Sequence, residues 1–269
     1  MTTTPTSVER VSAGHGGLRE AVADGITVTW RNVTAMKRVP EVLVFSTIQP
    51  VLFVLMFRYV FGGAIHVPGV RYVDYLMPGI FVQTIAFGAV QTGVGLAEDL
   101  GKGLIERFRS LPMSRSAVLA GRTAADLVRN LFVVTLMVAM GFLVGFRVHT
   151  NVFAFLAGFL MLMLFSFALS WAFALLGLTV GSAEAAQAAA FPALAPLVFA
   201  SSAFVPPQSM PGWLRVFADH QPVTATVNAV RALVLGGPMA RPVITALAWS
   251  LGLLALFAPL AVSRYRRAA

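Results

Sequence analysis

The chain has 269 residues, of which 58% are hydrophobic and only 12% charged, and its formal net charge is +9. Soluble domains carry about 25% charged residues, so this composition indicates a membrane protein and argues against an ordinary soluble enzyme. The positive balance fits the excess of Lys and Arg on the cytosolic side of membrane proteins better than it fits nucleic-acid binding.

The side chains that usually carry catalysis or hold metals are sparse. The chain contains no Cys, and its four His, at positions 15, 66, 149 and 220, are far apart in sequence. The patterns GxxxxGK[ST], HExxH and GxSxG do not occur in it. We therefore expect no catalytic residue, no metal site, and no nucleotide or other cofactor bound by the chain itself.

The first forty residues predict two segments before any membrane span. Residues 1–23 are rich in Thr, Ser and Gly and predict a disordered cytosolic tail. Residues 24–38 predict an interfacial helix, with Trp30 at headgroup level and Arg31 on the opposite face. Pro40 ends this helix and opens the next one.

The remainder, residues 24–269, predicts one all-α transmembrane domain with six spans. Runs of predominantly apolar residues place these spans at about 42–61, 75–97, 128–146, 152–180, 188–205 and 243–262. Pro50 predicts a kink in the first span. Gly88, Gly93 and Gly95 predict that the second span packs closely on its neighbours.

A charged segment, residues 99–127, separates the second span from the third. Placed on a helix, Leu104 and Phe108 fall on one side and Glu106 and Arg109 on the other, while Arg107 lies at the edge between them. Pro112 ends this helix, and Ser114 caps a second short helix that reaches Asp126. The segment is either an amphipathic helix that offers its charged face to a cytosolic partner or a solvated loop.

Residues 206–242 differ from the spans around them. Pro206, Pro207 and Pro211 interrupt the chain, and two short helical patterns follow, around Trp213 and over residues 223–235. We expect these two helices to form an external re-entrant hairpin, buried against protein as non-spanning backbone at membrane depth requires. A full span at 223–235 would instead place the three C-terminal Arg outside.

The distribution of Lys and Arg predicts cytosolic N- and C-termini. In the six-span layout fourteen of the 20 Lys and Arg lie on the cytosolic side, Arg129 among them. Few carboxylates fall within the spans, so the chain offers little for a proton relay. A six-span protein without an energy source of its own indicates a transport subunit driven by a partner.

Two stretches resemble a known family. Residues 106–115, ERFRSLPMSR, followed by Gly121, Arg122 and Asp126, resemble the signature of ABC-2 type permeases, above all the daunorubicin/doxorubicin-resistance branch of actinobacteria. Residues 201–231, with SSAFVPP, MPGW, HQP and NAVR in that order, resemble the same branch. Together these matches cover most of the chain from about residue 24.

The resemblance implies the ABC-2/ABCG-like exporter fold and a half-transporter in the cell membrane. Two permease chains, identical or related, would assemble with two separately encoded ATP-binding subunits that hold ATP and Mg²⁺. The segment 99–111 would be the coupling helix that docks on the ATPase, through Leu104, Glu106, Arg107, Phe108 and Arg109. The helix at 24–38 would be the connecting helix.

Further roles follow from the resemblance. Support of the coupling loop against the connecting helix falls to Trp30, Arg31, Arg115, Arg122 and Asp126. The substrate would pass between the permease chains, along Gln83, Phe87, Gln91 and Phe199, although the two Gln could instead form interhelical hydrogen bonds. Phe204, Trp213 and His220 would belong to an external gate, with capping of a loop as the alternative for His220.

The leading function is therefore efflux of an amphipathic or hydrophobic compound, such as an antibiotic or a lipid. Export of a lipid-linked glycan is the alternative within the same fold, and the scarcity of external carboxylates, Asp74 and Asp219, favours apolar cargo. A stand-alone secondary transporter predicts intramembrane carboxylates or an internal repeat. An integral membrane enzyme predicts clustered His or carboxylates at one interface.

Overall fold

The structure is a computed structural model, and every regular element that it describes is a helix or a helical turn. It describes residues 40–63, 65, 67, 69–103 and 115–268, and within them the side chains of all but 40–47, 61, 115–121, 266 and 268. The elements in chain order are α2 Pro40–Leu55, the π-helical turn η1 Met56–Phe61, α3 Tyr72–Gly101, α5 Arg115–Leu143, α6 Val152–Val180, α7 Ala183–Phe199, the 3-10 turn η2 Pro207–Ser209, α8 Gly212–Asp219, α9 Pro222–Leu235 and α10 Ala240–Ala268.

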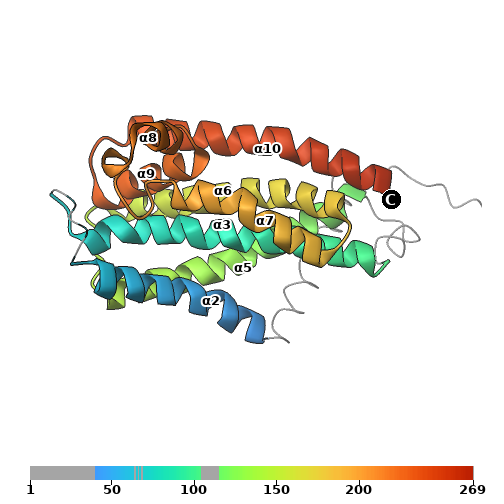
Figure 1. The fold of residues 1–269 in the computed structure, drawn as a ribbon, viewed down its shortest axis with the longest axis horizontal. Helices are drawn as coiled ribbons and strands as arrows, with labels where there is room; N and C mark the ends of the chain where they lie inside the picture. The colour runs from blue at the N-terminus through green and yellow to red at the C-terminus, as the bar shows by residue number, and fades with distance from the viewer. Residues whose placement is uncertain (1–39, 64, 66, 68, 104–114, 269) are drawn as a thin grey trace, which may run out of the picture.

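The long helices form one elongated bundle (Figure 1). α2 and α5 lie along one side of the bundle and α10 along the other, with α3 and α6 between them. The short helices α8 and α9 lie at the end where α3 begins, whereas α3 and α10 end at the opposite end. The first of these ends is called the α8–α9 end below.

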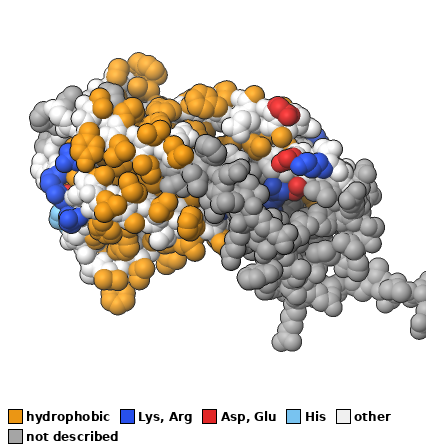
Figure 2. Space-filling model, turned by 90° about the horizontal axis from the view of Figure 1, so that it is seen from below, with side chains coloured by type: hydrophobic (Ala, Val, Ile, Leu, Met, Phe, Trp, Pro, Cys, Tyr) orange, Lys and Arg blue, Asp and Glu red, His pale blue; other side chains and the backbone are white. Residues whose placement is uncertain are grey.

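Four of the described helices are long and apolar enough to cross a membrane. They are Tyr72–Gly101, Arg122–Leu143, Val152–Val180 and Ala240–Tyr265, and they overlap the segments predicted as the second, third, fourth and last spans. Figure 2 shows hydrophobic side chains over the middle of one face and Lys and Arg side chains towards its two ends. A lipid-facing belt between charged ends has this appearance.

Side-chain caps explain where three helices begin. Asn151 Oδ1 accepts a hydrogen bond from the Ala154 amide at the start of α6, at 2.8 Å. Ser182 Oγ does the same for Ala185 at the start of α7, at 3.1 Å, and Gln221 Oε1 accepts from the Val223 amide at the start of α9. Each cap satisfies an amide that the helix itself leaves without a partner.

Three predicted boundaries were wrong. The second short helix, predicted to reach Asp126, and the third span are one continuous helix, α5. The last part of the charged segment 99–127 is therefore helical and belongs to α5. The seven-residue interval between the fourth and fifth predicted spans, 181–187, shrinks to two residues, because Ser182 caps α7 and Glu184 lies in its first turn. The fifth span was predicted to reach Val205, but α7 ends at Phe199 and a turn follows.

Candidate functional site along the central helix

Helix α3 is the centre of the bundle. Of its most apolar 18-residue stretch, 78% is buried within the chain, against 11% for α10. Its last residues lead directly into the segment 102–114, where the coupling contact is predicted. A displacement at that end of α3 would therefore reach the interior of the bundle along a single helix.

Glycines let the neighbouring helices approach the α3 backbone. A Cβ atom at Gly93 would lie 2.3 Å from the carbonyl oxygen of Phe173 on α6, and one at Gly177 would lie 2.1 Å from the carbonyl oxygen of Gly93. A Cβ at Gly88 would lie 2.5 Å from Asn130 Oδ1 on α5. The predicted close packing of this helix is confirmed, and it occurs at backbone-to-backbone distance.

A chain of polar contacts joins α3 to α5 in the half of the bundle next to the coupling segment. Arg122 forms an ion pair with Asp99 close to the end of α3. Further in, Thr92 donates a hydrogen bond to Asp126 Oδ2 at 2.6 Å, and Asp126 Oδ1 lies 3.1 Å from Arg129 Nη1. We call Thr92, Asp126 and Arg129 the buried ion-pair cluster.

The cluster lies deep in the bundle. Arg129 Nη2 donates to the carbonyl oxygen of Gly88 at 2.6 Å, and Gly88 is about 20 Å along α3 from Gly101 at ~1.5 Å per residue. Asp126 and Arg129 are only 7% and 8% exposed. Ionisable side chains at such depth within a membrane are costly and mark functional positions. Arg129 was counted among the Lys and Arg on the cytosolic side, and the structure adds that its side chain is buried between α5 and α3.

A second polar pair lies beside this cluster. Asn130 Nδ2 donates to Ser166 Oγ on α6 at 2.7 Å, and both residues are buried. The two contacts of α5, with α3 and with α6, therefore use consecutive residues, Arg129 and Asn130. Hydrogen bonds therefore connect α3, α5 and α6 at one level of the bundle.

The predicted coupling and support residues divide into two groups. Leu104, Glu106, Arg107, Phe108, Arg109, Trp30 and Arg31 lie outside the described residues, as does the side chain of Arg115. The other two, Arg122 and Asp126, have partners on α3. Their predicted contact with the connecting helix stays a prediction, because residues 24–38 are outside the described part of the chain.

The predicted substrate-path residues differ in exposure. Gln83 is 4% exposed and its Oε1 has no hydrogen-bond partner among the described residues, so an interhelical hydrogen bond at this oxygen is not found. Phe87 is half-buried, and Gln91 one turn further on is exposed. Phe199, at the end of α7, is 47% exposed. Exposure of the three α3 residues therefore increases along the helix, from buried Gln83 through Phe87 to exposed Gln91.

The predicted gate residues do not form one cluster. Phe204 is buried and stacks on Phe57, with 4.6 Å between ring centroids, and lies 5.9 Å from Phe199. Trp213 on α8 is 75% exposed. His220 is exposed and its Nδ1 lies 2.9 Å from the carbonyl oxygen of Val216 in the last turn of α8, and its part in a gate stays a prediction.

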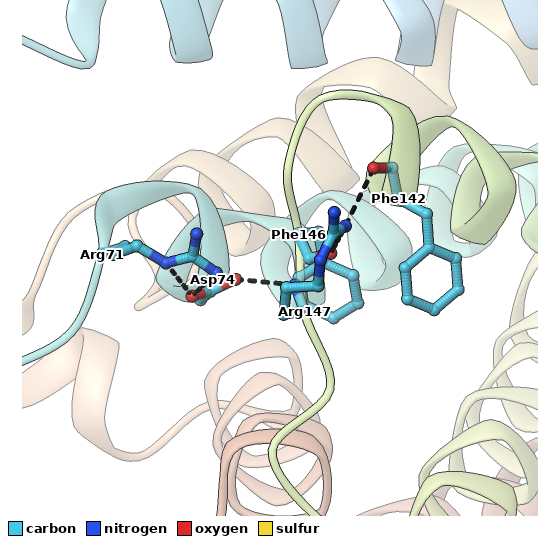
Figure 3. A network of polar contacts seen from close by, with 5 residues as sticks. All are labelled: Arg71, Asp74, Phe142, Phe146 and Arg147. Carbon is cyan, nitrogen blue, oxygen red and sulfur yellow. Dashed lines mark hydrogen bonds and ion pairs between the residues drawn. The ribbon is translucent and has the colours of Figure 1, made fainter.

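The α8–α9 end of the bundle is tied together through Asp74. Figure 3 shows Asp74 between Arg71 and Arg147. Arg71 Nε donates to Asp74 Oδ2 at 2.8 Å, and the Arg147 amide donates to Asp74 Oδ1 at 2.9 Å. Asp74, one of the two carboxylates counted as external, is 1% exposed, and it fixes the start of α3 to the turn before α6.

A second group at this end surrounds Arg231 of α9. Its guanidinium donates to the carbonyl oxygens of Tyr75 and Ser202 at 3.0 and 2.9 Å, and to Asn228 Oδ1 at 3.1 Å. Its Cζ lies 3.7 Å from the centre of the Tyr75 ring. Sequence reasoning quoted Asn228 and Arg231 as a motif but gave them no role.

Arg129 and Arg231, which received no site role from the sequence, carried a signal. Asp126 and Arg129 are opposite charges three positions apart, and Asn228 and Arg231 have the same spacing. Such pairs share a helix face and can meet. Treating an ionisable residue in an apolar helix as a functional hypothesis would have singled out Arg129 and Arg231.

Comparison with known proteins gives consistent matches over the whole chain. The profile of the ABC-2 type transporter family matches residues 25–235. The daunorubicin resistance ABC transporter permease protein DrrB1 of Streptomyces coeruleorubidus is 35% identical over 278 residues, covering 99% of this chain and 98% of that protein. The probable doxorubicin resistance ABC transporter permease protein DrrC of Mycobacterium tuberculosis is 29% identical over 286 residues, covering 100% and 99%. A putative transport permease, ycf38, of Cyanophora paradoxa is 26% identical over 74% of this chain and 69% of its own length.

Proposed function

The chain belongs to the ABC-2 type transporter family, and from this premise we propose that it is the permease subunit of an ABC exporter that moves amphipathic drugs out of the cell. The observation that carries the proposal is the match of 99% of the chain to a permease named for daunorubicin resistance. The exposed apolar belt and the absence of a P-loop pattern from the sequence support a membrane subunit that leaves ATP hydrolysis to a partner.

The partner is an ABC ATP-binding subunit, which holds ATP and Mg²⁺. We propose two copies of it, and a second permease chain that is identical or related to this one. The substrate would pass between the two permease chains, which supports a role for the exposed residues Gln91 and Phe199 on facing surfaces. Gln83 and Phe87 would line the deeper part of that path.

We propose six spans with both termini in the cytosol of a cell whose plasma membrane holds the protein. The two further spans would be α2 with η1, together 22 residues from Pro40 to Phe61, and the 17-residue α7. At ~1.5 Å per residue these are about 33 and 26 Å long, close to the ~30 Å hydrocarbon core. The 14 residues of α9 reach only about 21 Å, which supports a re-entrant helix over a span.

The route for coupling would run through α3. Closure of the ATPase dimer would displace the segment 102–114. The ion pair of Asp99 with Arg122 would pass that displacement directly from α3 to α5. The buried ion-pair cluster and the pair of Asn130 with Ser166 then make α3, α5 and α6 respond together. The role of Trp30 and Arg31 in holding the loop belongs to the same proposal.

Co-purification tests the predicted docking segment. The full chain is solubilised from its native membrane in mild detergent, and the ATP-binding subunit that comes with it is quantified. The double variant Glu106→Ala/Arg107→Ala is expected to lose most of that subunit. The matched control is Arg215→Ala/Asp219→Ala, which removes an exposed ion pair at the α8–α9 end and is expected to lose none. Equal loss in both variants, or no ATPase with the wild type, would contradict the assignment.

A further inference from the structure

A cavity of about 800 Å³ opens at the α8–α9 end, beside Arg231. Ligand sites have volumes of about 300–1,000 Å³ and combine apolar walls with a few placed polar groups. This cavity has both, because its walls comprise Ile65, Val67, Val205, Pro206 and Pro207 on the apolar side and Tyr75, Ser202, Gln208, Ser209, Asp219, Asn228 and Arg231 on the polar side.

No carboxylate of the described residues balances the positive charge of Arg231. Within the described residues no carboxylate lies at ion-pair distance from its guanidinium, whose partners are two backbone carbonyls, an amide oxygen and an aromatic ring. Burial lowers the pKa of Arg231 to about 10, so the group remains charged at neutral pH. A half-buried cation without an anion is unfavourable, and a bound anion would relieve that cost.

The guanidinium is also held in place for a ligand. Nε and Nη2 donate to the carbonyl oxygens of Tyr75 and Ser202, and one hydrogen of Nη1 goes to Asn228 Oδ1. A guanidinium has five N–H donors, so one hydrogen of Nη1 is left without a partner among the described residues. Ser202 is itself fixed, because its amide donates to Thr224 Oγ1 and its hydroxyl to Asn228 Oδ1.

The single carboxylate among the described wall residues does not cancel this charge. Asp219 Oδ2 lies 3.5 Å from Arg215 Nε, in an ion pair on α8, and Arg215 is not part of the cavity wall. Arg231 is therefore the one cation among the described wall residues, and the wall carboxylate, Asp219, has its ion-pair partner outside the wall. The apolar walls beside it suit hydrocarbon rather than a fully hydrated ion.

We propose that this cavity is a binding site for an amphiphile with an anionic phosphate or carboxylate group, which Arg231 holds while the apolar walls contact its hydrocarbon part. The site is separate from the path proposed for the drug between permease chains and does not depend on it. The ligand is a membrane phospholipid or an exported compound with the same chemistry.

Binding to the purified full chain tests the proposal. The probes are dihexanoyl phosphatidylglycerol, which is anionic, and dihexanoyl phosphatidylcholine, which has the same tails and no net charge. Native mass spectrometry in a neutral detergent counts the molecules bound. We expect one saturable phosphatidylglycerol per chain and at least tenfold weaker phosphatidylcholine binding. Equal affinity for the two probes would overturn the proposal.

Two kinds of variant separate binding from folding. Arg231→Gln is expected to abolish saturable binding, but it also removes contacts that hold Ser202. Gln208→Glu places a negative charge on an exposed residue of the cavity wall without touching those contacts, and is expected to weaken phosphatidylglycerol binding about three- to tenfold. Arg241→Gln, an exposed cation outside the wall, should change nothing. Unchanged affinity in Gln208→Glu would overturn the proposal.

The same experiment distinguishes the source of the ligand. A wild-type chain that leaves its native membrane with one phospholipid attached, lost in Arg231→Gln, supports a resident lipid. A wild-type chain that carries no lipid and binds the added probe supports an exported compound. Displacement of the probe by an equal concentration of inorganic phosphate would overturn the requirement for an amphiphile.

Discussion

Replacing Asp126 by Ala tests the buried ion-pair cluster. The variant removes the carboxylate that lies 3.1 Å from Arg129 Nη1 and accepts from Thr92 Oγ1 at 2.6 Å. The side chains of Arg129 and Asp126 are only 7% and 10% exposed, so Arg129 would keep its charge with the Gly88 carbonyl as its one remaining described partner. Breaking a buried pair in this way costs about 3–5 kcal/mol. We expect Asp126→Ala to lower the free energy of unfolding by that amount.

The assay is unfolding in mixed micelles of increasing SDS content, followed by circular dichroism. In the double variant Asp126→Ala/Arg129→Ala both charges are gone, so its cost should fall short of the sum of the single costs by about 1–3 kcal/mol. The control is Glu98→Ala, which removes an exposed pair at the end of α3 with 2.6 Å between Glu98 Oε1 and Lys102 Nζ, and should cost about 0.5 kcal/mol or less. The reasoning is refuted if Asp126→Ala costs no more than Glu98→Ala, or if the single costs simply add.

Three further predictions concern α3 and α8. Gly93→Ala should destabilise the fold by about 1–3 kcal/mol, because its Cβ would meet a backbone carbonyl of α6. The control Gly252→Ala on α10, with open space around it, should be neutral or stabilising. Equal thermal midpoints of the two variants would contradict this prediction. Gln83→Leu should leave stability unchanged or raise it by about 1–2 kcal/mol while lowering drug transport, since the buried Oε1 has no described partner; a loss of stability would instead favour an interhelical hydrogen bond. Trp213→Phe should lower the fluorescence quenching caused by lipids brominated near their headgroups, and unchanged quenching would show that α8 does not lie at the lipid interface.

The spans were predictable because apolar length alone identifies them. The helices α3, α6 and α10 follow from runs of about 20 apolar residues, and the short helices α8 and α9 follow from Pro and Gly at their ends. The break predicted before Val128 failed because Arg122, Asp126 and Arg129 lower the apolarity of the segment. In the structure Arg122 pairs with Asp99 of α3, and Asp126 pairs with Arg129 of α5 itself, so the helix continues past these charges.

The site was harder to predict because its contacts join distant parts of the chain. Asp126 and Arg129 are neighbours in sequence, but their roles depend on Thr92 and Gly88, some forty residues earlier on α3. Similarly, Arg231 meets Tyr75, and neither residue alone indicates a cavity. A single sequence predicts which residues share a face of each helix. It does not indicate which faces of different helices pack against each other.

The central claim is that this permease exports an amphipathic drug at the expense of ATP hydrolysed by a partner subunit. The most direct measurement is daunorubicin movement in proteoliposomes that contain the chain and its co-purified ATP-binding subunit, followed by fluorescence with and without ATP and Mg²⁺. The account predicts movement that requires both subunits and ATP, and that falls in the Glu106→Ala/Arg107→Ala variant. Movement by the permease alone, driven by an ion gradient and insensitive to ATP, would contradict it.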